Sequence, residues 1–354
     1  MTASAEPPSP TAPDRPDGSE PSRRITPDSS DSSESGPRRG LVLGAGGVLG
    51  ISWMLGALVA LEASDGWDPR TADVLLGTSA GSVIAAFLGS GVSVATLANH
   101  PRGIEVEEGL NLRWDYEAHS VRPPLPRPVV GSPALVRSAL RTSGRRPPMT
   151  AVYGLLPRGR ASLQPLADVV QTVAPSPGWA SHPATWIVAM NYRTGERVPF
   201  GHPAAPRTSL SQAVVASCSI PGWYEPVPID GELYIDGGAY SATSLDLLVD
   251  AGLDEVVVLA PMASFAYDAP ASVAARLERR WRRRLSRRLL AAAERVSAAG
   301  TAVTLLGPGP EDLTTIGANL MDSRRRAEVF ETSVRTTAAA LTEPADAAVR
   351  TKPV

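Results

Sequence analysis

The sequence predicts an α/β fold with three layers, α/β/α, around a mostly parallel central sheet. Two observations lead to this prediction: short apolar segments alternate with longer segments of helical pattern, and the first two short segments run straight into glycine-rich turns. Strands that alternate with helices form parallel sheets, and helices then cover both faces of such a sheet. The chain has 354 residues, of which 43% are hydrophobic, enough for one large globular domain.

Strands are expected where short apolar runs end at turn residues. The strand at 41–43 runs into glycines, and the strand at 73–76 runs into Gly77-Thr78-Ser79. Two further runs flank Asp230-Gly231, a dipeptide that is a strong signal for a tight hairpin when it lies between apolar segments. The expected strands, in chain order, are 41–43, 73–76, 186–189, 227–229, 233–235, 255–260 and 303–306.

Helices are expected where longer apolar-patterned segments lie between these strands. The first ends at Asp65-Gly66, and the third is closed by Pro221-Gly222, because glycine and proline end helices efficiently. The expected helices, in chain order, are 48–63, 80–88, 210–218 and 272–298.

The domain organisation follows from composition. Residues 1–38 are rich in Pro, Ser, Asp and Glu, so they cannot bury enough apolar surface to fold and are expected to be disordered. A single domain is expected over 39–341, followed by a short flexible tail at 342–354. The proline-rich stretch 100–183 is expected to form either a lid or cap over a site or irregular surface.

Composition also excludes several functions. The formal net charge of −2 gives no indication of a nucleic-acid partner, and Cys218 is the only cysteine, which excludes an intrachain disulfide and a multi-cysteine metal site. The N-terminus has no secretory signal pattern, and no apolar run is expected to be long enough to span a bilayer. We therefore expect a cytoplasmic protein or one bound peripherally at the membrane.

The first chemical motif is Gly77-Thr78-Ser79-Ala80-Gly81, a GxSxG between an apolar strand and an apolar helix. In that context the glycines Gly77 and Gly81 permit a sharp turn that exposes the serine hydroxyl at a helix N-terminus, where the helix dipole favours negative charge. The motif therefore marks Ser79 as a candidate nucleophile. The alternative is a chance occurrence in a chain rich in Gly and Ser.

The second motif is the glycine-rich turn from Gly44 to Gly50, also between strand and helix. Its backbone N–H groups can bind an anion, so Gly46 and Gly47 could donate to the oxyanion of an acyl-transfer intermediate. A dinucleotide loop is a second interpretation, but it requires an acidic residue at the end of the next strand, where the chain has Gly77-Thr78-Ser79 instead. A purely structural tight turn is the third interpretation.

The third motif is Asp236-Gly237-Gly238, directly after the second hairpin strand. A carboxylate at a strand end followed by Gly237 and Gly238 is held in place yet left uncovered, which suits a catalytic base. The alternative is a turn aspartate. Asp230-Gly231 occupies the position of the hairpin turn and needs no catalytic role, whereas no strand pairing explains Asp236 in the same way.

The histidines limit the mechanism. The α/β-hydrolase triad runs Ser, acid, His along the chain, but no histidine follows Asp236. Either Asp236 is the base in a dyad with Ser79, or an earlier histidine is used in an unusual order; we favour the dyad. Because an aspartate with a pKa of about 3.9 is a weak base, either burial beside Ser79 would have to raise that pKa or the geometry would have to compensate. The histidines are His100, His119, His182 and His202.

Together, these ordered motifs resemble the patatin-like phospholipases. Three further features strengthen the resemblance, which covers roughly 41–258. They are the segment 216–221 followed by 224–227, and the C-terminal stretches 310–313 and 319–322, which are similar to bacterial members.

The resemblance implies a patatin-like fold and a serine lipid acyl hydrolase, of phospholipase or lysophospholipase type, that uses no metal and no cofactor. It implies Ser79 as nucleophile, Asp236 as base, and N–H groups of Gly46 and Gly47, with that of Ala80, as oxyanion donors. The motif-supporting glycines are Gly44, Gly50, Gly77, Gly81, Gly237 and Gly238.

Two positions depart from the family pattern, and they leave the substrate open. Ala45 replaces the usual glycine, and Leu49 replaces a frequent Arg or Lys, which puts the preference for phospholipids over neutral esters in doubt. The alternatives are a carboxylesterase or transacylase acting on other acyl esters, and a catalytically silent binding protein that retains the fold.

The helix expected at 272–298 carries an apolar stripe among many arginines. A basic amphipathic helix can lie on an anionic membrane, which would suit a lipid hydrolase. The favoured interpretation is a stripe packed on the core with a solvated basic face. The stripe consists of Val273, Leu277, Trp281, Leu285 and Leu289, and the arginines are Arg279, Arg280, Arg282, Arg283, Arg284, Arg287 and Arg288.

Overall fold

The computed structural model describes residues 36–104, 129–141, 149–266, 270, 272–342 and 348–351. Pro37 begins the unit that holds nearly all of them. Most of the predicted disordered tail, 1–38, lies outside the described residues, as do 105–128 and 142–148 of the predicted lid region.

A nine-stranded sheet forms the centre of the fold and confirms the predicted architecture. Its order is β5-β6-β3-β2-β1-β7-β8-β9, with β4 paired to β3. The pairs from β3 through β2, β1 and β7 to β8 are all parallel, and antiparallel strands complete both sides. The strands are β1 (Arg39–Leu43), β2 (Val74–Thr78), β3 (Thr185–Asn191), β4 (Arg197–Phe200), β5 (Val227–Ile229), β6 (Glu232–Asp236), β7 (Glu255–Leu259), β8 (Ala302–Leu306) and β9 (Ala348–Thr351).

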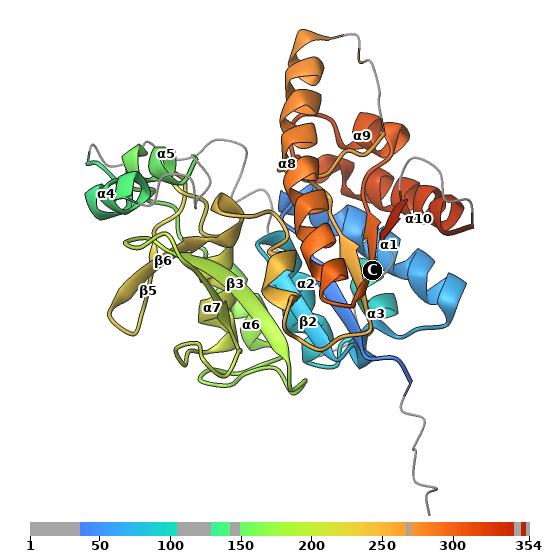
Figure 1. Cartoon of the computed structure of the whole chain (residues 1–354), viewed down its shortest axis with the longest axis horizontal. Coiled ribbons are helices and arrows are strands. Elements are labelled where there is room, and N and C mark those ends of the chain that lie inside the picture. The colour runs from blue at the N-terminus through green and yellow to red at the C-terminus, as the bar shows by residue number, and fades with distance from the viewer. Residues whose placement is uncertain are drawn as a thin grey trace, which may run out of the picture. The chain divides into compact units, whose positions relative to one another are not determined.

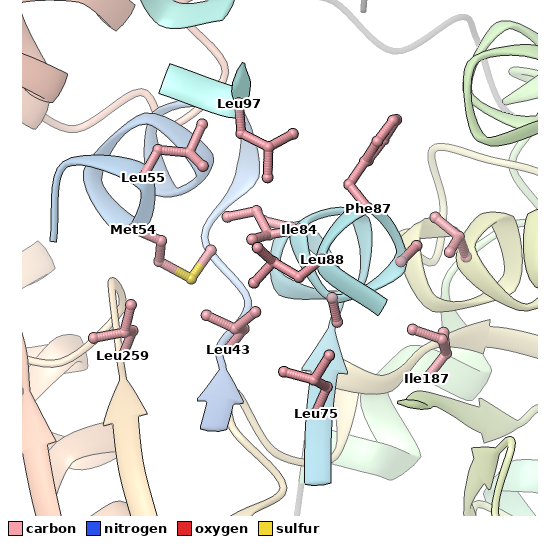
Figure 2. Close-up of a cluster of buried hydrophobic side chains, with 14 of the residues drawn as sticks. Leu43, Met54, Leu55, Leu75, Ile84, Phe87, Leu88, Leu97, Ile187 and Leu259 are labelled. Carbon is pink, nitrogen blue, oxygen red and sulfur yellow. The ribbon is translucent and has the colours of Figure 1, made fainter. Parts of the chain in front are cut away.

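Side chains alternate across the sheet and define the two outer layers. Leu41 and Leu43 of β1 join a core with helices α1 (Gly47–Asp65), α2 (Ala80–Gly89) and α7 (Leu210–Cys218). Val42 between them points to the opposite face, which α8 (Val273–Ala298) covers. Figure 2 shows the first core, where Leu43, Leu75, Ile187 and Leu259 of the strands meet side chains of α1 and α2.

Helix α1 corrects one expectation. By length and composition this 19-residue helix is apolar enough to cross a membrane, although no such run was expected. Two thirds of its most apolar window, 67%, is buried, and Ser333 of α10 (Arg326–Thr342) donates a hydrogen bond to its Trp53 carbonyl at 2.7 Å. Its apolar character is therefore explained by burial between the sheet and α10.

The region expected to be a lid or irregular surface contains three short helices among its described residues. They are α4 (Pro133–Arg141), α5 (Met149–Leu155) and α6 (Gln164–Gln171). Figure 1 shows α4 and α5, in green, near β6 and away from α10. Three other helices were not expected from the sequence: α3 (Val94–Arg102), α9 (Pro310–Ile316) and α10.

The predicted flexible tail at 342–354 needs a partial correction. Ala348–Thr351 form β9, which pairs antiparallel with β8. The end of the chain thus supplies backbone hydrogen bonds to a strand that would otherwise lie at the edge of the sheet.

The favoured interpretation of the Arg-rich helix is wrong for the first half of α8. Val273, Leu277 and Trp281 of its apolar stripe are 79%, 69% and 44% exposed, and only Leu289 at the far end is buried. By contrast, Arg279 and Arg282 are buried, at 4% and 1% exposed. Their guanidinium groups contact the carboxylate of Glu278, which makes their burial tolerable.

Candidate active site

Ser79 lies in a strained turn between β2 and α2. Its backbone has φ 52° and ψ −120°, a region that residues other than glycine seldom adopt. The strain is held by Ser217, whose Oγ accepts a hydrogen bond from the Ser79 N–H at 2.8 Å and donates to the Val188 carbonyl at 2.6 Å. The turn therefore has the geometry that the GxSxG motif predicts.

Strand register brings Asp236 to this turn from 157 positions away. Thr78 of β2 pairs with Val188 of β3, and the next residue of β3, Ala189, pairs with Asp236 at the end of β6. As a result the Ser79 hydroxyl donates to Asp236 Oδ2 at 2.7 Å. The other carboxylate oxygen, Oδ1, accepts the N–H of Gly238 at 2.7 Å.

Both side chains of this pair are buried. Ser79 is 8% and Asp236 5% exposed. Burial raises the pKa of Asp236 to about 6, and the hydrogen bonds from Ser79 and Gly238 only partly oppose that rise. Such a carboxylate is a better proton acceptor than a solvated one while still ionised at neutral pH.

The predicted oxyanion donors lie at the N-terminus of α1 and at the start of α2. Gly46 and Gly47 line the same cavity as Ser79 and Asp236, whereas Ala80 is buried and does not line it. Within the described chain, the N–H groups of these three residues have no backbone acceptor. Gly47 has φ +62°, and a Cβ there would lie 3.0 Å from the sulfur of Met321.

The supporting glycines allow close packing beneath the site. A Cβ on Gly81 would lie 2.1 Å from the Leu43 carbonyl oxygen, so no side chain fits. The Gly81 N–H donates to the Gly44 carbonyl at 3.1 Å, which joins the two glycine-rich turns. Close approaches also occur at Gly44, Gly77, Gly237 and Gly238, whereas a Cβ on Gly50 would lie at an ordinary contact distance of 3.4 Å from Pro261.

A cavity of about 570 Å³ opens at the carboxyl ends of β1, β2 and β7, the usual position of ligand sites in parallel sheets. Most of its lining is apolar, with Asp236 as the one carboxylate among the described lining residues. Helix α5 contributes Met149 and Tyr153 to the lining, and α8 contributes Trp281 and several neighbours. The remaining side chains from α8 are Arg284, Leu285, Arg288 and Leu289.

Several residues of this site were not predicted from their patterns. Ser217 lies in the segment 216–221 that carried part of the family resemblance, but no role was predicted for its hydroxyl. Tyr153 of α5 lines the cavity from a region whose structure was left open. Nothing in its local sequence distinguishes it from a surface tyrosine.

The described histidines lie elsewhere. Nε2 of His182 is 2.6 Å from the Ala72 carbonyl oxygen, and His202 packs edge-on against Trp186. Neither these nor His100 of α3 line the cavity, and His119 lies outside the described residues. Among the residues that the structure describes, no group of three or more His, Cys, Asp or Glu side chains could hold a metal ion.

Comparison with known proteins identifies a family and several similar structures, among which are the following two. The model of the patatin-like phospholipase family matches residues 41–249. The chain is similar to VipD from Legionella pneumophila, with 16% identity and a TM-score of 0.42, over 90% of this chain and 68% of that one. It is also similar to the type III effector protein ExoU, with 16% identity and a TM-score of 0.35, over 89% of this chain and 55% of that one.

Proposed function

Because the chain belongs to the patatin-like phospholipase family, whose members hydrolyse ester bonds, we propose that it is a serine lipid acyl hydrolase with a Ser79–Asp236 dyad. The observation that carries this proposal is the hydrogen bond of 2.7 Å from Ser79 Oγ to Asp236 Oδ2 within the cavity. The strained backbone of Ser79 supports a functional role for this contact, because such strain is concentrated at active sites.

In the first step, Ser79 Oγ attacks the ester carbonyl carbon and its proton passes to Asp236. The carbonyl oxygen becomes negatively charged and is stabilised by the N–H groups of Gly46 and Gly47, with that of Ala80 as a further donor. When the tetrahedral intermediate collapses, the ester C–O bond breaks and the leaving alcohol takes the proton from Asp236. An acyl group remains on Ser79.

In the second step, water replaces the alcohol. Asp236 takes a proton from the water as its oxygen attacks the acyl carbon, and the same N–H groups stabilise the second oxyanion. Collapse breaks the bond to Ser79, whose oxygen recovers the proton from Asp236. The products are the free acid and the enzyme in its starting state.

The apolar lining supports an acyl chain as the group that enters the cavity. A volume of about 570 Å³ is typical of a small-ligand site, and Ile220, Met262 and Leu285 offer an apolar surface to a chain. A carboxylesterase or transacylase acting on other acyl esters is the second candidate, since the same lining accepts other apolar acyl groups.

We also propose that the protein is cytoplasmic and makes a peripheral contact with a lipid surface. Exposed apolar side chains lie at the cavity. Trp281 of α8 and Met149 of α5 line it, and Leu277 and Val152 lie on the same two helices. Exposed apolar side chains beside exposed arginines are the features of an interfacial helix. A membrane contact here would place the cavity next to its substrate.

A fluorophosphonate probe tests the dyad. We expect covalent labelling of the wild-type protein, loss of labelling in Ser79→Ala, and a labelling rate about 10²- to 10⁴-fold lower in Asp236→Asn, because the base is lost. The rate should rise with pH around 6, as Asp236 loses its proton. Ser90→Ala, at the far end of α2, is the control: its Oγ has no hydrogen-bond partner among the described residues, and the variant should keep the label.

Absence of labelling in folded wild-type protein would favour the catalytically silent alternative. Labelling together with release of fatty acid from lipid esters would support the hydrolase. Labelling with transfer to an added alcohol, in place of release, would favour the transacylase.

A further inference from the structure

Two arginines of α8 line the cavity that contains Ser79 and Asp236. Arg284 and Arg288 are both exposed, and they are one helical turn apart, so their side chains emerge from the same face. The cavity thus joins a carboxylate and hydroxyl on one side to two guanidinium groups on the other. In Figure 1, α8 (orange) and α5 (green) stand apart from each other, and both contribute to the lining.

Neither guanidinium has a carboxylate partner in the part of the chain that the structure describes. Other arginines of the same helix do have one: Arg279 and Arg282 share Glu278, and Arg295 lies 3.8 Å from Asp246. Like charges spaced four residues apart repel each other. A bound anion would relieve that repulsion.

Tyr153 connects the arginines to the dyad electrostatically. Burial raises the pKa of this tyrosine, the charge of Asp236 raises it further, and the charge of Arg288 lowers it. Its ring therefore lies within the field of both groups. Because Arg288, Tyr153 and the dyad line the same cavity, one molecule bound in it can contact both Arg288 and Ser79.

We propose that Arg284 and Arg288 bind the phosphate of a glycerophospholipid while its acyl ester lies at Ser79. Guanidinium groups form paired, charge-assisted hydrogen bonds with phosphate oxygens, and the glycerol links this phosphate to the esters by a few bonds. The proposal rests on the proposed hydrolase function and assigns the residues that recognise the head group: Arg284 and Arg288, outside the family match, favour a phosphate-bearing substrate over a neutral glyceride.

The activity test compares two substrates and two variants of equal charge change. Arg284→Gln/Arg288→Gln removes the proposed pair, and Arg280→Gln/Arg287→Gln removes two exposed arginines of the same helix that do not line the cavity. Hydrolysis is measured in non-ionic micelles with dilauroyl phosphatidylglycerol and with dilauroylglycerol. We expect the first variant to lose about tenfold or more in kcat/KM on the phospholipid alone.

The control variant should keep its activity on both substrates. A parallel loss on both substrates in Arg284→Gln/Arg288→Gln would overturn the proposal, because it would indicate damage to the cavity. An equal loss in the control variant would also overturn it, because it would indicate attraction by overall charge.

A binding measurement separates this proposal from the catalytic one. With Ser79→Ala in every protein, calorimetric titration of monomeric dihexanoyl phosphatidylglycerol should give a Kd about tenfold higher when Arg284 and Arg288 are glutamine. This difference in affinity would support the head-group site even if the wild-type protein showed no turnover. Absence of turnover would then contradict only the proposed hydrolase function. Equal affinities in the two proteins, or inorganic phosphate that binds as tightly as the lipid, would overturn the head-group site.

Discussion

At the scale of single residues, burial of one carboxylate links function to stability. Asp236 accepts hydrogen bonds from Ser79 and from the Gly238 N–H, and burial still raises its pKa to about 6. In the unfolded chain an aspartate has a pKa of about 3.9. The folded state therefore binds a proton more tightly, and this favourable contribution, complete below pH 4, is lost as the pH rises through 6.

We predict that Asp236→Asn stabilises the fold at the expense of activity. The ionised carboxylate costs up to about 3 kcal/mol of stability above pH 6, a cost that asparagine does not have. Urea unfolding should therefore show a gain for Asp236→Asn that is about 1 kcal/mol larger at pH 8 than at pH 5.

The hairpin turn supplies the control for this measurement. Asp230 is exposed, with φ 50°, a conformation that asparagine also adopts readily. Asp230→Asn should change stability by the same small amount at both pH values. A difference between Asp236→Asn and wild type that is constant with pH would contradict the link between burial and proton binding.

At the scale of elements, α8 holds part of the active site in place from the opposite layer. Arg282 Nη1 donates to the Pro261 carbonyl at 2.6 Å, and the ring of Pro261 fills the space beside Gly46, where a Cβ would approach within 2.7 Å. The buried arginine thus supports the loop behind a predicted oxyanion donor. Glu278 compensates the charge of that arginine from the same helix.

We predict that Glu278→Gln destabilises the protein by on the order of 3 kcal/mol. The substitution removes the carboxylate that two buried guanidinium groups share, and an uncompensated buried charge is costly. Chemical unfolding measures the change. Glu294→Gln, an exposed position on the same helix, should shift the free energy of unfolding by less than about 0.5 kcal/mol, and equal effects at both positions would refute the buried network.

At the scale of the whole molecule, the family match stops before the sheet is complete. The matched residues, 41–249, lack β7 and β8 together with α8 and α10. In the complete fold β1 lies between β2 and β7, and the core on the α8 side needs Val256 and Val258. We therefore propose that the folding domain spans 39–341.

We predict that a chain of residues 39–341 folds and reacts with the fluorophosphonate probe, and that a chain of residues 39–249 does neither. The shorter chain leaves β1 as an edge strand and exposes one face of the sheet to water, which removes most of one core. Near-UV circular dichroism and labelling measure the outcome. If the full chain folds but the chain of residues 39–341 does not, β9 is required for folding.

Much of the fold was predictable because local signals agreed with the tertiary structure. Helix α7 was expected at 210–218 and has those bounds. The hairpin was expected at Asp230-Gly231, and both residues have the positive φ angles of a tight turn. Two of the motifs lie together because β1 and β2 are parallel and their carboxyl ends share one edge of the sheet. Asp236 ends the antiparallel strand β6 and reaches them through its register with Ala189 of β3.

What could not be predicted depends on contacts between distant residues. Helix α10 approaches Gly56 of α1 so closely that a Cβ there would lie 2.8 Å from that of Ser333. The polar residues Ser333 and Thr337 lie on its buried face, so the sequence shows no clear apolar periodicity there. The burial of Arg282 was missed for a related reason. Helical spacing cannot reveal that a carbonyl 21 positions away accepts its hydrogen bond.

The hydrogen bond from the Gly81 N–H to the Gly44 carbonyl has a kinetic consequence. It fastens the loop after β1 to the first turn of α2, so the attacking oxygen and the amides that receive the anion move as one body. A boronic acid that becomes tetrahedral on Ser79 would bind to a site that is already in its final conformation. Its capture should follow a single exponential whose rate constant grows in proportion to inhibitor concentration, without the plateau that a slow rearrangement imposes.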